Sequence, residues 1–317
     1  MRTDLTAFFR KTDALRQAIA QVVVGQDQVV THLLAAIVAD GHVLLEGVPG
    51  VAKTLLARLV ARLIEAPFGR LQFTPDLMPS DVLGTNVFDV KAQDFVFHPG
   101  PVFKQMLLVD EVNRAPAKTQ AALFEVMEER QVTIDGCTHR MDALFTIIAT
   151  QNPVEQEGTY KLPEAQLDRF LVKLTMGYPS PEEELEMLRR HQKHNLLDLS
   201  EVKPVVRCEE LLALRGLMNE VVVDEAVLRY ICNITQLTRH ARTIYLGASP
   251  RAAVALLRMA KAMALLGGRD FATPDDVKKV APAVLSHRLV LTAEAEMEGM
   301  TVERAVERQL EAATVDS

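Results

Sequence analysis

The stretch GHVLLEGVPGVAKT, residues 41–54, decides the fold of this chain. Its apolar run at 43–45 follows an Asp-Gly break and predicts a short buried strand. A turn rich in glycine and proline comes next and ends in Lys53-Thr54, where an apolar-striped helix begins. This order of strand, turn, Lys-Thr and helix is typical of phosphate-binding sites, because backbone N–H groups of the turn and of the helix start point at the anion.

Three residues at the end of the turn carry the expected chemistry. The Lys53 ammonium would reach the β- and γ-phosphates of a nucleotide, and the Thr54 hydroxyl would bind Mg²⁺. The generic pattern has a glycine before the lysine, whereas this chain has Ala52. A methyl group is tolerable at that position only if the residue does not need a positive φ.

Length and composition indicate an ordinary globular protein with two domains. The chain has 317 residues, 49% of them apolar, which is enough for a large core. Its net charge of −7 argues against a broad basic surface for nucleic acid. The three cysteines lie far apart without metal-ligand spacing, which indicates thiols in a reducing compartment. Without a signal-peptide pattern or a membrane-length apolar run, the chain is expected to be soluble and cytoplasmic.

Four further apolar runs predict strands, at 70–73, 105–110, 145–149 and 170–174. The second of them, QMLLVD, ends in the acidic pair Asp110-Glu111. Buried carboxylates are costly without a partner, and beside a phosphate turn that partner would be Mg²⁺. Asp110 would hold the ion directly or through water, and Glu111 would orient and polarise the attacking water. The alternative is a helix N-cap followed by a first-turn acid.

Asn152 follows the apolar run 145–149, at the carboxyl end of a predicted strand. Ligands bind at that edge in open α/β sheets, and an amide both donates and accepts hydrogen bonds. Asn152 is therefore a candidate sensor of the γ-phosphate and the attacking water. A simple Asn-Pro turn is the alternative interpretation.

Arg169 has two interpretations. It is adjacent to Asp168 and would then form a structural ion pair, or it is presented to the phosphates of a neighbouring subunit as an arginine finger. Arg251 lies in the predicted first turn of the helix 252–266, where a cation opposes the helix dipole. This placement indicates an anionic partner for Arg251, and a solvated surface arginine is the alternative.

The linker at 22–25, VVVG, separates two helical patterns within residues 4–39. In a nucleotide enzyme an apolar linker at this distance before the phosphate strand can fold over the base, which makes Val24 and Gly25 candidate contacts. An ordinary core turn explains the same residues equally well.

Two hairpins are expected between the larger elements. Residues 84–99 alternate loosely around a polar centre and predict an inserted hairpin, which is either a functional loop or a decorative insertion. The pair Asp135-Gly136 is a strong hairpin signal between residues 131 and 144.

The clearest domain boundary is at Pro179-Ser180-Pro181. Ser180 as N-cap, Pro181 at the first helical position and Glu183 three residues past the cap predict a helix start. Beyond it no strong strand pattern occurs, and Thr273 repeats the capping pattern. Helices are expected near 181–194, 208–220, 225–241, 250–266 and 274–286, with a charged helical tail to about 313.

Taken together, these pieces resemble an AAA+ ATPase, and more narrowly the MoxR family within the helix-2-insert group. The resemblance covers about residues 21–178, and Ala52 is the usual residue in MoxR-like phosphate turns. It is carried by GVPGVAKT (47–54), FTPDLMPSDVLGT (73–85), LLVDEVNRAPAKTQAALFEVMEE (107–129), IATQNPVEQEGTYKLPEAQLDRF (148–170) and, in the helical part, ASPRA (248–252).

The resemblance implies an α/β fold: a parallel five-stranded sheet between helices in residues 1–179, and a smaller α-helical lid domain in residues 180–317. Residues 84–99 would be the helix-2 insert and 131–144 the presensor hairpin, both facing the pore or the substrate. ATP and Mg²⁺ are the implied ligands. The residues implied to contact the nucleotide are Val24, Gly25, Gly47, Val48, Pro49, Gly50, Val51, Ala52, Lys53, Thr54, Leu55 and Arg251.

The resemblance also implies a role for each candidate side chain. Asp110 and Glu111 would be the Walker B pair, with Asp110 and Thr54 at the metal. Asn152 would be sensor 1, Arg169 the finger acting in trans, and Arg251 sensor 2.

A homohexameric ring that remodels or activates a protein client is implied as well, with a von Willebrand A domain protein as the partner. Alternatives are a metal-chelatase ATPase subunit or a nucleic-acid translocase. The translocase is disfavoured because Lys91 and Arg140 are the only candidate basic residues in the two hairpins. A non-hydrolysing scaffold is disfavoured by the intact Lys53, Asp110, Glu111 and Arg169. A GTPase is disfavoured because the sequence lacks the Asn-Lys-x-Asp motif with which GTPases recognise the base.

Overall fold

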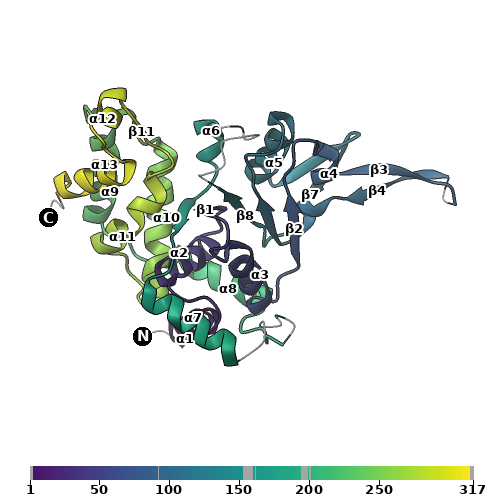
Figure 1. The fold of residues 1–317 in the computed structure, drawn as a ribbon, viewed down its shortest axis with the longest axis horizontal. Helices are drawn as coiled ribbons and strands as arrows, with labels where there is room; N and C mark the ends of the chain where they lie inside the picture. Colours follow the sequence, from purple (N-terminus) through teal and green to yellow (C-terminus); the bar gives the residue numbers. More distant parts are fainter. Residues whose placement is uncertain are drawn as a thin grey trace.

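A computed structural model describes residues 3–91, 93–152, 160, 162–193, 199 and 201–314. At its centre is a sheet of five parallel strands in the order β2-β5-β8-β1-β9 (Figure 1). The predicted parallel five-stranded α/β fold is thus confirmed, with each strand within two or three residues of its predicted bounds. The strands are β1 (Val43–Gly47), β2 (Phe68–Gln72), β5 (Met106–Asp110), β8 (Thr146–Gln151) and β9 (Val172–Met176).

Helices cover both faces of this sheet because its central strands are apolar on both sides. Val43 and Leu45 of β1 face one core, whereas Leu44 between them faces the other. The first core is completed by α1 (Thr3–Ala20), α2 (Asp27–Val38) and α3 (Lys53–Leu63). The second core is completed by α4 (Pro79–Leu83), η1 (Pro101–Phe103) and α5 (Ala117–Glu129).

Both predicted hairpins are present. The first, β3 (Gly84–Asp89) with β4 (Asp94–Pro99), projects far from the body of the molecule (Figure 1). The second, β6 (Gln131–Ile134) with β7 (Cys137–Arg140), turns at Asp135-Gly136, where both residues have the positive φ of a type I′ turn. The hairpins contact each other, since Asn86 Nδ2 donates to Asp135 Oδ2 over 2.6 Å.

The C-terminal part is helical, as predicted. The capping box before α7 is confirmed by bonds from the Ser180 N–H to Glu183 Oε2 and from the Glu183 N–H to Ser180 Oγ. Thr273 caps α11 in the same way, with Asp276 as its partner. Together with the short α6 (Glu164–Leu167), the helices are α7 (Pro181–Lys193), α8 (Cys208–Gly216), η2 (Leu217–Asn219), α9 (Glu225–His240), α10 (Pro250–Leu266), α11 (Pro274–Leu285), α12 (Ala293–Met297) and α13 (Val302–Ala312).

A small antiparallel pair, β10 (Ile244–Leu246) with β11 (Val290–Leu291), lies within this helical part. The sequence did not predict it, because strands of three and two residues are too short to show a period of two. The pair ties the segment before α10 to the segment before α12.

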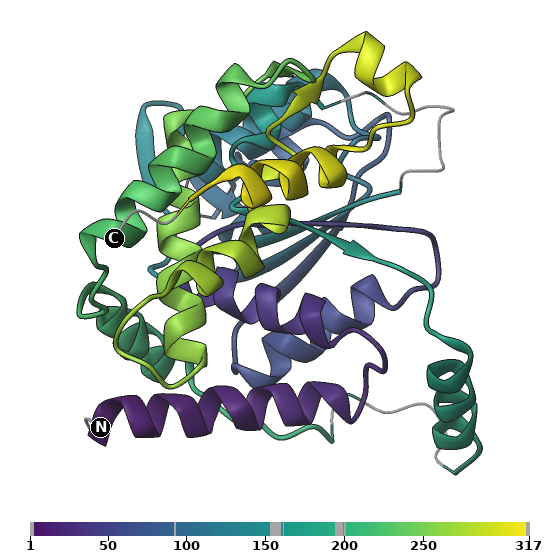
Figure 2. The same ribbon diagram turned by 90° about the vertical axis from the view of Figure 1, so that its left-hand side faces the viewer.

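The helical part packs against the α/β part through the first core, to which α8–α11 contribute buried side chains. Arg258 of α10 donates to the carbonyls of Ala39 and Asp40, and Arg215 of α8 donates to the carbonyl of Ile37. In Figure 2 α7 stands apart from α9–α13, and Arg190 on it donates to carbonyls at the end of α1. No helix within the described ranges is both long and apolar enough to cross a bilayer.

Candidate functional site

The predicted phosphate turn connects the end of β1 to the start of α3, which begins at Lys53. Gly47 is required because a Cβ there would lie 2.6 Å from the carbonyl oxygen of Met176 on β9. Gly50 has φ +87° and faces open space, so the backbone can approach a ligand closely. The Lys53 ammonium folds back over the turn and donates to the carbonyls of Gly47 and Val48.

Ala52 has φ +65°, in the left-handed region. The expectation that a methyl group is tolerated only without a positive φ was therefore wrong. The chain passes from the turn into α3 at this residue, and the left-handed conformation is what redirects it. The cost is about 1–2 kcal/mol for a residue with a Cβ, which the surrounding turn and helix offset.

Asp110 and Glu111 end β5 at the same edge of the sheet. Asp110 is buried, accepts a bond of 3.2 Å from the Thr150 hydroxyl on β8, and pairs with Arg70 Nε of β2 at 2.7 Å. The Glu111 N–H donates to the same Thr150 hydroxyl. Glu111 has φ +56° and α5 begins only at Ala117, so the alternative of a helix N-cap is wrong.

The Glu111 carboxylate points toward the β2 edge. Its Oε2 accepts from Gln72 Nε2 at 2.7 Å and from Arg114 Nη1 at 2.9 Å. Two donors hold the Glu111 carboxylate and the Thr150 hydroxyl accepts from its N–H, so this glutamate at positive φ is positioned rather than free to turn.

One cavity of about 390 Å³ joins the phosphate turn, the acidic pair and Asn152. They meet because β1, β5 and β8 are parallel neighbours whose carboxyl ends share one edge. Asn152 itself is buried just beyond β8. The cavity is lined by Pro49, Gly50, Ala52, Lys53, Thr54, Leu55, Arg70, Gln72, Asp110, Glu111, Thr150 and Asn152.

Sequence reasoning missed three of these residues: Arg70, Gln72 and Thr150. Arg70 and Gln72 are two residues apart on β2, so they face the same side of the strand. Polar residues at this spacing near a strand end were the available signal. Thr150 gave no signal of its own, because its role depends on β8 lying beside β5.

The donor set fits a nucleotide with Mg²⁺. Lys53 supplies a cation for phosphate, and Thr54 with Asp110 supplies the hydroxyl and carboxylate oxygens that Mg²⁺ prefers. In the part of the chain that the structure describes, no cluster of three or more His, Cys, Asp or Glu residues could hold a metal by itself.

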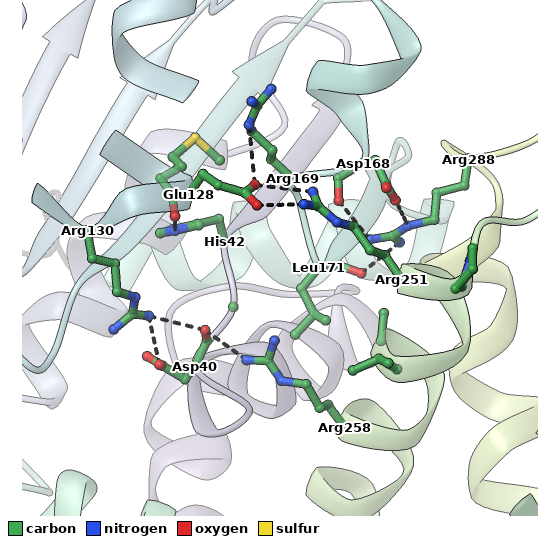
Figure 3. A pocket seen from close by; sticks show the side chains of 15 residues that line it. Asp40, His42, Glu128, Arg130, Asp168, Arg169, Leu171, Arg251, Arg258 and Arg288 are labelled. Carbon is green, nitrogen blue, oxygen red and sulfur yellow. Dashed lines mark hydrogen bonds and ion pairs between the residues drawn. The ribbon is translucent and has the colours of Figure 1, made fainter. Parts of the chain in front are cut away.

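Arg169 and Arg251 lie in a second cavity, of about 500 Å³, between the α/β part and α10. Figure 3 shows the terminal nitrogens of Arg251 turned toward Glu128 of α5, whereas Arg169 approaches the same carboxylate with Nε and its terminal nitrogens point away. Arg251 Nη2 lies 2.7 Å from Glu128 Oε1, and Arg169 Nε lies 3.5 Å from Glu128 Oε2. The structure thus brings the two predicted arginines together, and it places neither among the residues that line the cavity of the phosphate turn.

The alternative of an Asp168–Arg169 ion pair is wrong. Asp168 accepts instead from Arg288 Nε over 2.7 Å, and this arginine also donates to the backbone carbonyls of Phe170 and Leu171. The Asp168–Arg288 pair joins the segment between α6 and β9 to the segment that follows α11.

Val24 and Gly25 lie near the end of β9. The neighbouring Gln26 donates to the carbonyl of Gly177, one residue past the strand, and a Cβ on Gly25 would meet the Glu183 carboxylate at 2.5 Å. Because Gly47 also packs against β9, the linker lies at the same edge of the sheet as the phosphate turn. Contact of Val24 and Gly25 with a base stays a prediction.

Comparison with known proteins gives consistent matches. The family model of the ATPase family associated with various cellular activities (AAA) matches residues 42–172, and a model of the AAA lid domain matches residues 236–309. Chaperone MoxR1 of Mycobacterium tuberculosis is 43% identical over 92% of this chain and 79% of its own length. Protein MoxR of Methylorubrum extorquens is 33% identical over 88% of this chain and 87% of its own length.

A crystal structure of a Cytophaga hutchinsonii protein classed as an ATPase superposes with a TM-score of 0.91. It is 42% identical in sequence, and the match covers 99% of this chain and 97% of that one.

Proposed function

This chain belongs to the MoxR family of AAA ATPases, and on that premise we propose that it hydrolyses ATP with Mg²⁺ as one subunit of a ring. The observation that carries the proposal is the meeting of Lys53, Asp110 and Glu111 in one cavity at the carboxyl edge of the sheet. These are the cation, the metal ligand and the carboxylate that phosphoryl transfer to water requires.

Each residue then has a defined task. Lys53 leaves its carbonyl partners and neutralises charge on the β- and γ-phosphates, while the N–H groups at the start of α3 hold the phosphate oxygens. Thr54 and Asp110 would hold Mg²⁺, which offsets charge on the same phosphates. Glu111 accepts a hydrogen bond from the attacking water and aligns it with the γ-phosphorus, and Asn152 donates to that phosphate.

The positions of Arg169 and Arg251 support a site completed by a second subunit. Charge that develops on the transferring phosphoryl group requires a further cation, and an arginine in trans supplies it in many NTPases. Both arginines lie outside the chain's own phosphate cavity, so we assign them to the nucleotide of the neighbour. A closed homohexamer satisfies this arrangement, because each subunit supplies its phosphate turn to one interface and its two arginines to the other.

We propose that the client is a protein, which the ring remodels as a chaperone does, since a relative with 43% identity is named a chaperone. A von Willebrand A domain partner and a cytoplasmic location belong to the same proposal. The projecting β3–β4 hairpin supports it with exposed apolar side chains, among them Phe88, Val90 and Phe95. A metal-chelatase subunit or a nucleic-acid translocase is the second candidate, and stimulation of turnover by DNA at physiological salt would favour the translocase.

The test is ATP turnover by the purified chain with Mg²⁺, by wild type and by Glu111→Gln. The amide keeps the shape of the side chain but is a poor base, so we expect turnover to fall by about a hundredfold or more. Binding of a fluorescent ATP analogue should be retained. Turnover by Glu111→Gln at the wild-type rate would contradict the assignment of the base, and absence of turnover in wild type would contradict the proposed activity.

A further inference from the structure

The cavity that holds Arg169 and Arg251 carries an excess of positive charge. Its lining includes five arginines but three carboxylates, namely Arg130, Arg169, Arg251, Arg258 and Arg288 with Asp40, Glu128 and Asp168 (Figure 3). An open cavity with this balance favours an anion.

Three of the five arginines are committed to the fold. Arg288 has 4% of its side chain exposed and is held by Asp168 and by backbone carbonyls. Arg258 donates to the carbonyls of Ala39 and Asp40, and Arg130 pairs with the Asp40 carboxylate at 2.7 Å. An incoming anion would have to break these contacts to engage any of the three, and the contacts of Arg288 are buried.

Arg169 and Arg251 are held differently, by one shared carboxylate. Arg251 is 61% exposed and directs both terminal nitrogens at Glu128, with Nη2–Oε1 at 2.7 Å and Nη1–Oε2 at 3.2 Å. Arg169 Nε approaches Glu128 Oε2 at 3.5 Å, and its Nη1 donates to the Ala165 carbonyl at 3.3 Å. Glu128 is therefore the anion at the meeting point of an arginine from the α/β part and an arginine from α10.

The geometry of the Arg251 pair indicates what this carboxylate does. The paired terminal nitrogens are the edge with which a guanidinium binds a phosphate, and here both face Glu128. A carboxylate that only positioned the arginine for a phosphate would leave that edge free. Because Arg251 is largely exposed, the ion pair contributes little to stability and is readily exchanged for a stronger anion.

We propose that Glu128 is an internal stand-in for the γ-phosphate of the neighbouring subunit's nucleotide. In the separate chain its carboxylate occupies Arg251 and approaches Arg169; in the ring the phosphate displaces it. Glu128 thus competes with nucleotide-dependent assembly and sets the ATP concentration at which the subunits close. This inference rests on the proposed function, because it needs a neighbour that presents ATP.

The experiment compares Glu128→Gln with Glu129→Gln. Both substitutions remove one negative charge from adjacent, exposed positions at the end of α5, but only Glu128 lines the cavity that holds Arg169 and Arg251. Two quantities are measured at fixed ionic strength: the KM for ATP, and the protein concentration of half-maximal assembly with a non-hydrolysable ATP analogue. We expect both to fall about two- to fivefold in Glu128→Gln and to stay at wild-type values in Glu129→Gln. The same Glu128 substitution in an Arg251→Ala chain should change assembly by less than about twofold, because the competing pair is already broken.

Equal behaviour of the two glutamine variants would overturn the inference. A higher KM or slower turnover in Glu128→Gln would also overturn it, because Glu128 would then hold the arginines in place for catalysis. Persistence of the full effect in the Arg251→Ala chain would show that Glu128 acts elsewhere and would overturn it too. Failure of the proposed function has a different signature: neither wild type nor any variant would hydrolyse ATP or assemble with it, and both proposals would fall.

Discussion

At the residue scale, the phosphate cavity is built around backbone positions that side chains usually avoid. Ala52 and Glu111 both have positive φ, at 65° and 56°, and both line the cavity. Such conformations persist only where neighbouring contacts determine them, and they concentrate at functional sites. At Glu111 the contacts are with Thr150, Gln72 and Arg114. At Ala52 they come from the turn and from the first turn of α3.

Ala52→Gly tests the strain directly. Glycine adopts positive φ without a Cβ penalty, so we expect the free energy of unfolding to rise by about 0.5–1 kcal/mol, measured by urea denaturation. The matched control is Ala121→Gly on the exposed face of α5, where glycine should lower the free energy of unfolding by about 1 kcal/mol. A loss of equal size at both positions would show that Ala52 is not strained.

How far the sequence predicts the site depends on whether a residue's role is local. The turn, Lys53 and the acidic pair were predicted because each is defined by its neighbours along the chain. Arg70, Gln72 and Thr150 were not, because they reach Asp110 and Glu111 only across β2-β5-β8, an order of strands that the sequence does not show. The partner of Asp168 was missed for the same reason, since Arg288 is 120 residues away.

At the element scale, buried polar contacts fix the strands to the helices around them. His42, just before β1, is fully buried; its Nδ1 accepts from the Ile147 N–H of β8 at 3.0 Å, and its Nε2 faces the Met127 carbonyl of α5. This pattern defines a neutral ring with the proton on Nε2. Burial, and to a lesser degree the nearby Arg130 charge, lowers the pKa of His42 to about 4.

This burial makes stability depend on pH. In the unfolded chain His42 binds a proton below about pH 6.5, whereas the folded chain does not until about pH 4. The unfolded state therefore gains protons first, and stability is lost as the pH falls through this window, by about 2 kcal/mol at pH 5. Urea unfolding at pH 7 and pH 5 measures the loss. His42→Gln should reduce it, and the exposed His240→Gln should leave it unchanged; equal losses in all three chains would contradict the assignment.

The elements themselves were largely predictable, for local reasons. The Ser180 and Thr273 caps and the Asp135-Gly136 turn each act within four residues, and each is present as the sequence indicates. The position of α7 was not predictable, because it depends on distant contacts such as those of Arg190 with the carbonyls at 20 and 21.

At the scale of the whole molecule, the two cavities are separate features of one packed structure. The first core runs from the sheet into α9–α11, and Arg258 fixes α10 to the turn before β1. Arg251, in the first turn of α10, is thus placed beside Arg169 rather than beside Lys53. Head-to-tail contacts of identical copies bring such unlike surfaces together, and they close into a ring when the rotation allows it.

Mixing two inactive variants tests whether the cavities meet between subunits. Arg169→Ala keeps the cavity of its own phosphate turn but lacks the proposed finger, and Glu111→Gln keeps the proposed finger but lacks the proposed base. Each variant alone should lose most of its ATP turnover, and Arg169→Ala should lose up to about a thousandfold. In rings mixed at equal amounts, about a quarter of the interfaces combine the intact cavity of one with the intact arginine of the other, so turnover should recover to that order. Arg169→Ala mixed with the double variant Arg169→Ala/Glu111→Gln contains no intact arginine and should recover none. Rings that form normally yet show no recovery in the first mixture would place the arginine's action within its own subunit and contradict the shared site.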